Sequence, residues 1–85
     1  MSRPVKRSLL LNGHATSLTL EAPFWWALKR LAAEAGQNVA ELVAELDTAP
    51  RLGGLSGHVR LYVLAELAKR AGCTEWLLPP RSEGA

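Results

Sequence analysis

An alternating stretch near the N-terminus constrains the fold of this 85-residue chain more than any other feature. Over residues 15–21, ATSLTLE, the leucines point one way and the polar residues the other, with a period of two. This alternation predicts a β-strand with one apolar and one polar face. The rest of the chain carries mostly helical patterns, so the strand must find a partner for its backbone N–H and C=O groups.

The sequence allows two different pairing partners for this strand. Asn12-Gly13 is the strongest short-range hairpin signal, because both residues accept positive φ. The apolar run at 7–11, RSLLL, would then pair with 14–18 of the same chain. In the other arrangement the strand pairs antiparallel with its own copy in a second chain. If the hairpins of two protomers also paired with each other, the dimer could have a four-stranded ribbon, which is too wide for a DNA groove.

Three helices are predicted after the strand. The first has an apolar stripe, a proline that suits its first turn, and a glycine stop at Gly36. The second begins with the N-cap Asn38, and Glu41 completes a variant of the capping box. The third ends at Gly72. The predicted ranges are 22–35, 38–48 and 56–71.

The chain length suits one small domain. We expect a flexible basic arm over 1–6, a folded domain over 7–78 and a flexible tail over 79–85. The fold class is mainly α with a short N-terminal β-strand or hairpin. A core of this size is marginal, which favours oligomerisation as a source of stability.

Composition and motifs narrow the function. The net charge of +2 permits nucleic-acid binding without demanding it. The chain has one cysteine and no Ser–His–Asp set, glycine-rich phosphate loop or metal-ligand cluster. We therefore expect no enzymatic activity, no catalytic residue, no cofactor and no metal. No apolar run approaches the ~20 residues of a membrane span, so we expect a soluble, cytoplasmic protein with no membrane partner.

The stretch TSLTLEAPFWWALKRLAAEAGQNVAELVAEL resembles the ribbon-helix-helix family of DNA-binding proteins. More narrowly, the GH·TS segment, the LE··FW helix start and the LS···R·YVL third helix are similar to a bacterial subfamily with an extra C-terminal helix. The resemblance covers residues 7 to about 67. It implies an intertwined homodimer whose antiparallel β-ribbon enters the major groove of DNA.

The resemblance also implies roles for three sets of residues. Outward side chains of the strand would face base edges: Ala15, Ser17 and Thr19. Residues of the basic start, the turn and the N-terminus of the second helix would contact the DNA backbone: Lys6, Arg7, His14, Asn38 and Val39. Apolar residues of the strand and helices would form the dimer core: Leu18, Leu20, Trp25, Leu28, Leu42, Val43 and Leu46.

These roles predict a sequence-specific transcriptional regulator whose partners are double-stranded DNA and a second copy of itself. Two residues weaken that prediction. Ala15 offers only a methyl contact where the family often places a long basic or amide side chain, and Glu41 opposes a phosphate at the second helix. The alternative is a homodimeric protein-interaction module, or an antitoxin-like protein, with the same fold and weak or no DNA binding. A further protein partner therefore stays open.

Overall fold

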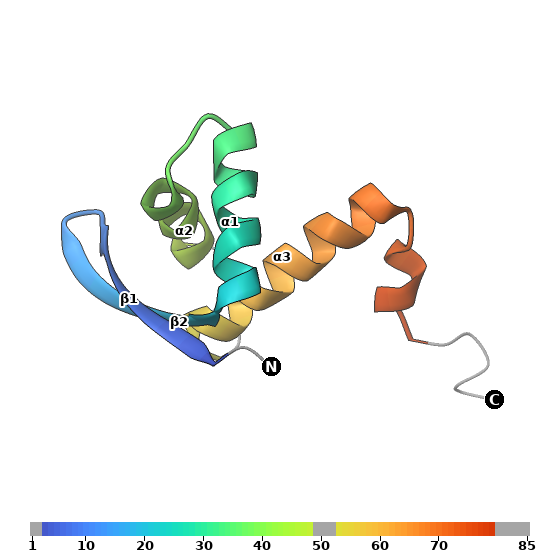
Figure 1. Cartoon of the computed structure of the whole chain (residues 1–85), viewed down its shortest axis with the longest axis horizontal. Coiled ribbons are helices and arrows are strands. Elements are labelled where there is room, and N and C mark those ends of the chain that lie inside the picture. The colour runs from blue at the N-terminus through green and yellow to red at the C-terminus, as the bar shows by residue number, and fades with distance from the viewer. Residues whose placement is uncertain (1–2, 49–52, 80–85) are drawn as a thin grey trace.

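The computed structural model describes residues 3–48 and 53–79. In these residues a β-hairpin is followed by three α-helices and a short 3-10 turn, η1 (Figure 1). The predicted fold class, mainly α with a short N-terminal β-strand or hairpin, is confirmed, and the hairpin is the form present. The elements are β1 (Pro4–Leu11), β2 (His14–Glu21), α1 (Ala22–Glu34), α2 (Val39–Thr48), α3 (Leu55–Ala71) and η1 (Thr74–Leu77).

The hairpin provides the strand partner within the chain. β1 and β2 are antiparallel, and Leu11 lies opposite His14 at the turn. Asn12 and Gly13 have φ of 51° and 83°, the two positive values that a type I′ turn requires. Of the two arrangements open on the sequence, the structure has the intrachain one.

β1 starts earlier than predicted. It begins at Pro4, whereas the sequence predicted a strand from residue 7 and a flexible arm over 1–6. Residues 4–6 belong to the ladder because β2 is long enough to pair with them, as Pro4 opposite Glu21 shows. The first two residues of the predicted arm lie outside the described residues, as does the predicted tail after Pro79.

The helix boundaries lie within one residue of the predicted ones at each end. Ser56, which the sequence suggested as the N-cap of α3, lies inside the helix, and the N-cap is Gly54. At α2 the Asn38 N–H donates to Glu41 Oε1 and the Glu41 N–H donates to Asn38 Oδ1, both at 2.8 Å. This reciprocal pair is a complete capping box. Gly72 ends α3 with φ 72°, a left-handed conformation that glycine adopts without steric cost. No helix of the described residues is long and apolar enough to cross a membrane.

The core lies between the inner face of the hairpin and the helices. Leu18 and Leu20 from β2 are fully buried against Leu28, Val43 and Val59 from α1, α2 and α3. All seven residues predicted for a dimer core belong to this core of the single chain: six are buried, and Leu46 is half-buried and packed against them. A second chain is not needed to cover them, and their place at a dimer interface stays a prediction.

Candidate nucleic-acid interface

The hairpin turns one face away from the helices. Side chains alternate between the two faces of a strand, so every second residue of each strand lies on this outer face. On β1 and β2 the cross-strand pairs of the outer face are Pro4 with Glu21, Lys6 with Thr19, Ser8 with Ser17, and Leu10 with Ala15. Six of the eight residues are exposed, and Thr19 and Glu21 are half-buried. The structure thus places the three predicted base-facing residues together with Lys6 on one surface.

The start of α3 holds the outer edge of β2 at Thr19. The Thr19 N–H donates to Ser56 Oγ at 3.3 Å, and Arg60 Nη2 donates to the Thr19 carbonyl at 3.4 Å. Arg60 also donates from Nε and Nη2 to the Glu21 carboxylate, at 2.9 and 3.1 Å. These contacts account for the partial burial of Thr19. Pairing of β2 with its own copy would need this same edge, so they compete with that arrangement.

The Arg60–Glu21 contact predicts a pH dependence of stability. The hydrogen bonds from Arg60, helped by a backbone hydrogen bond and by its charge, hold the pKa of Glu21 below its ordinary value of 4.5. A carboxyl whose pKa is lower in the folded state stabilises the fold above its unfolded pKa and loses that contribution as the pH falls through the folded value. We therefore expect Glu21→Gln to reduce the loss of stability between pH 6 and about pH 3.

The measurement is the free energy of unfolding from urea titrations at several pH values in this range. Other carboxylates titrate in the same window, so the comparison is between the slopes of the wild-type chain and of Glu21→Gln. Identical slopes would contradict a depressed pKa at Glu21. Glu75→Gln, at an exposed residue of η1, serves as the carboxylate control.

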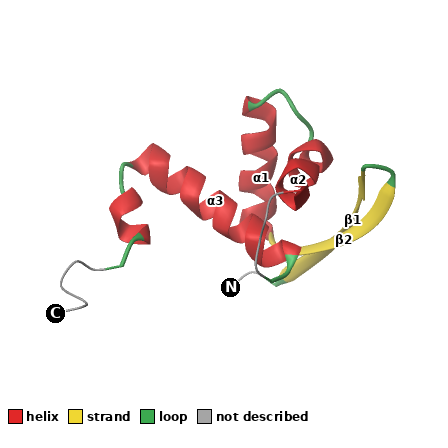
Figure 2. Cartoon of the chain, turned by 180° about the vertical axis from the view of Figure 1, so that it is seen from behind, coloured by secondary structure: helices red, strands yellow, loops and turns green. Residues whose placement is uncertain are grey.

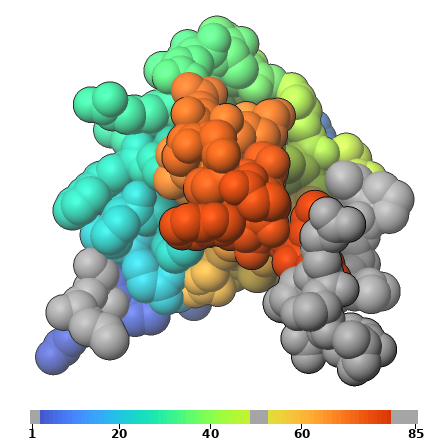
Figure 3. Space-filling model, turned by 90° about the vertical axis from the view of Figure 1, so that its right-hand side faces the viewer, coloured from blue at the N-terminus to red at the C-terminus, as the bar shows by residue number. Residues whose placement is uncertain are grey.

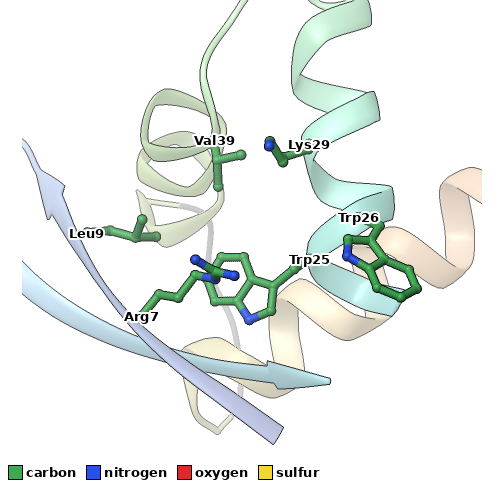
Figure 4. A pocket seen from close by; sticks show the side chains of 6 residues that line it. All are labelled: Arg7, Leu9, Trp25, Trp26, Lys29 and Val39. Atoms are coloured by element: carbon green, nitrogen blue, oxygen red, sulfur yellow. The ribbon is translucent and has the colours of Figure 1, made fainter. Parts of the chain in front are cut away.

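The inner side of β1 borders a pocket of about 290 Å³ between α1 and α2 (Figure 4). The Arg7 guanidinium lies 5.5 Å from the centroid of the Trp25 ring, which is a cation–π contact. Trp25 is held in turn, because its Nε1 donates to the Val5 carbonyl at 3.0 Å. The pocket is lined by Arg7, Leu9, Trp25, Trp26, Lys29 and Val39.

The predicted DNA-backbone residues do not form one cluster. Lys6 lies on the outer face of the hairpin, whereas Arg7, its neighbour in sequence, points to the inner side. His14 is exposed beside the turn. Arg7 and Val39 both line the pocket. Lys29 lines it as well, and the sequence did not predict this cation as a DNA contact. The sequence signal for Lys29 is its position on α1 four residues after Trp25, because residues four apart lie on the same face of a helix.

The N-terminus of α2 is partly used by its own cap. The Asn38 N–H donates to Glu41, so this group is engaged within the chain. Asn38 Oδ1 accepts from the Glu41 N–H, so the side chain is engaged as well. Val39, the next residue, lines the pocket beside Arg7 and Lys29. Two cations and Val39, the first residue of α2, therefore line one open cavity, and the Glu41 carboxylate lies at the start of the same helix.

Comparison with known proteins agrees with this architecture. The family model described as "Ribbon-helix-helix domain" matches residues 4–67. The fold is similar to a solved structure, that of an uncharacterized protein from Bordetella pertussis Tohama I, with a TM-score of 0.71 and 28% sequence identity. That similarity covers 94% of this chain but only 66% of the other protein. No curated protein matches the chain. Because the family match covers most of the chain, from β1 through much of α3, the chain belongs to the ribbon-helix-helix domain family.

Proposed function

We propose that the protein is a DNA-binding transcriptional regulator that acts as a homodimer and places the outer face of its hairpin in the major groove. The observation that carries this proposal is the outer face itself. It has a lysine, small polar side chains and no acid between Lys6 and Thr19 on either strand, and a buried inner face fixes it to the helices. The major groove admits a two-stranded ribbon of this kind.

The outer face changes in character along the hairpin, which suggests how it would read DNA. Near the turn, Leu10 and Ala15 form an apolar pair that suits contact with the methyl group of thymine. Ser8 and Ser17 in the middle can donate to or accept from base edges. Lys6 at the far end can reach a phosphate or a guanine. We expect thymine at the base pairs nearest the turn and weak discrimination elsewhere.

Further contacts to the DNA backbone would come from the pocket on the inner side of β1. Arg7 and Lys29 bring two positive charges to the pocket beside Val39, where a phosphate could meet both cations and the helix N-terminus. Glu41 opposes this contact, because its carboxylate already takes the Asn38 N–H. We expect Arg7 and Lys29 to contribute more to the binding of a DNA phosphate than the N-terminus of α2 does.

The test of the proposal is selection of bound duplexes from a randomised pool at low salt, followed by affinity measurements across a salt series. Enrichment of a shared sequence, with an affinity that falls steeply with salt, is the expected result. A pool that stays random would remove the proposal and favour the second candidate.

Lys6→Ala is expected to weaken binding to all duplexes about equally. Removing one phosphate interaction reduces the slope of log affinity against log salt by about 1. Fluorescence anisotropy with a selected and an unrelated duplex measures both quantities. Arg3→Ala, an exposed basic residue before β1, is the charge-matched control. An unchanged slope in Lys6→Ala would place Lys6 away from the phosphates.

A homodimeric interaction module, or an antitoxin-like protein, is the second candidate. The specific observation in its favour is the capping box, which engages Asn38 and leaves a carboxylate at the N-terminus of α2. The small side chain of Ala15 at a base-facing position supports it too. The two candidates differ in the selection experiment, since a module that has lost DNA binding enriches no sequence.

A further inference from the structure

The pocket between β1, α1 and α2 has a lining that a DNA phosphate would use only in part. Four of its six lining residues are apolar, and two of these, Trp25 and Trp26, carry indole rings. In Figure 4 the side chains of Arg7, Lys29 and Trp25 border the same space, with Leu9 on the β1 side. A phosphate would contact the two cations and leave the apolar part of the lining uncovered. The lining therefore fits a ligand that has an apolar body as well as a negative charge.

The two cations of the pocket carry charge that the chain does not neutralise. Among residues 3–48 and 53–79, neither Arg7 nor Lys29 pairs with a carboxylate, whereas Arg60, Lys69 and Arg70 each pair with a glutamate. No acidic residue lines the pocket either. The guanidinium of Arg7 has five N–H donors in a planar fork, which matches the two oxygens of a carboxylate. An anion in the pocket would thus meet two positive charges that have no acidic partner.

The indole rings and the size of the pocket define the apolar part of such a ligand. Trp25 is 5% exposed, and its ring is fixed by the hydrogen bond from Nε1 to the Val5 carbonyl. Trp26, the next residue, is 66% exposed. Aromatic rings pack on one another more favourably than their buried area alone accounts for. A volume of about 290 Å³ is at the lower end for small-molecule sites, so it suits one ring or two fused rings.

The pocket lies on a part of the molecule that α3 does not cover. All of its lining comes from β1, α1 and α2. Figure 2 shows that α3 extends away from α2 and the hairpin and carries η1 at its far end. Seen from the end of α3, side chains of α1 project beside it at the surface (Figure 3). A ligand can therefore approach α1 and the hairpin without displacing α3 or η1.

We infer that this pocket binds a small aromatic carboxylic acid, with its ring against Trp25 and Trp26 and its carboxylate between Arg7 and Lys29. The DNA phosphate of the proposed function would use the same two cations, so the acid and DNA compete for them. The acid is then an effector that releases the protein from DNA. This competition rests on the proposed function, whereas binding of the acid does not.

The experiment follows the indole N–H signals of the three tryptophans in the ¹⁵N-labelled full chain while 1-naphthoate is added. We expect the signals of Trp25 and Trp26 to shift and that of Trp76, on η1 and outside the lining, to stay in place. Three further probes separate the parts of the ligand: 1-naphthylmethanol has the rings without the charge, acetate has the charge without the rings, and inorganic phosphate is the anion of the DNA backbone. Each should bind at least about 10-fold more weakly than naphthoate. Equal affinity for any of them, or a shift of Trp76 alone, would overturn the inference.

Lys29→Gln tests the role of the charge at the pocket. It should weaken naphthoate binding by about 3-fold, as expected for one exposed ion pair, and leave the binding of 1-naphthylmethanol unchanged. Lys29→Arg keeps the charge and should restore the affinity for naphthoate. Arg30→Gln, at the next residue of α1, is the control, because it removes one exposed positive charge that does not line the pocket. An equal loss in Lys29→Gln and Arg30→Gln would contradict a specific site.

DNA binding is then measured with and without the acid at constant ionic strength. At ten times its Kd, naphthoate should lower the apparent affinity for a selected duplex by about 10-fold, as exclusive binding requires, and acetate is the control for the added salt. Unchanged affinity for DNA with naphthoate bound would overturn the competition. Naphthoate binding by a chain that enriches no DNA sequence would remove the regulator proposal and keep this site. DNA binding without naphthoate binding would do the reverse.

Discussion

Leu18→Ala is expected to lower the free energy of unfolding by about 3 kcal/mol, because it removes fully buried methyl groups and leaves a cavity. Leu18 is 0% exposed on the inner face of β2, opposite Arg7 of β1. A chain of 85 residues has a total stability on the order of 4–13 kcal/mol, so the loss is a large share of it. Urea unfolding followed by tryptophan fluorescence, to which buried Trp25 contributes, measures the change.

The matched control is Leu10→Ala in the same hairpin. Leu10 lies on the outer face, so its truncation should change the free energy of unfolding by less than about 0.5 kcal/mol. The pair tests the orientation of the hairpin directly. Equal losses at the two positions would mean that the hairpin does not pack through its Leu18 face.

Local chemistry made the elements of this fold predictable. The Asn12-Gly13 turn has the two positive φ values that its residue types favour, and Asn38 with Glu41 forms the capping box that starts α2. The apolar alternation of β2 predicted which residues enter the core, and Leu18 and Leu20 are fully buried. Each of these features depends on residues close in sequence.

The contacts that shape the candidate site were beyond sequence reasoning, since they join distant segments. Arg60 reaches Glu21 and the Thr19 carbonyl across about 40 residues, and Ser56 takes the Thr19 N–H. No periodicity places a residue of α3 at the edge of β2. These contacts matter for function, because they engage part of the β2 edge that a ribbon paired with its own copy would use.

The side of the hairpin on which Arg7 lies depends on the same kind of distant contact. Residues of a strand alternate between its faces, so Arg7 and Lys6 lie on opposite sides, and the role of Arg7 as a DNA-backbone contact stays a prediction. The turn fixes the register so that Arg7 lies opposite Leu18 on the inner side, where the Trp25 ring accepts its guanidinium. An amphipathic side chain can occupy such a position because its stem packs while its charge stays near solvent.

Ser17→Glu is expected to weaken DNA binding by about 100-fold, equivalent to ~3 kcal/mol, since a carboxylate in the groove meets like charge and replaces a hydroxyl that can donate. Ser17 is exposed at the centre of the outer face, opposite Ser8, and the change leaves the buried face untouched. Anisotropy titrations with a selected duplex at low salt measure the loss.

Thr74→Glu is the control for this substitution, because it also exchanges an exposed hydroxyl residue for glutamate but lies in η1, at the other end of the molecule from the hairpin turn (Figure 1). Both variants carry the same net charge, so a general electrostatic effect would weaken binding equally in the two. A loss confined to Ser17→Glu assigns the outer face of the hairpin to the groove. Equal affinities in the two variants would place DNA on some other surface, and the hairpin would then be a structural cover of the core.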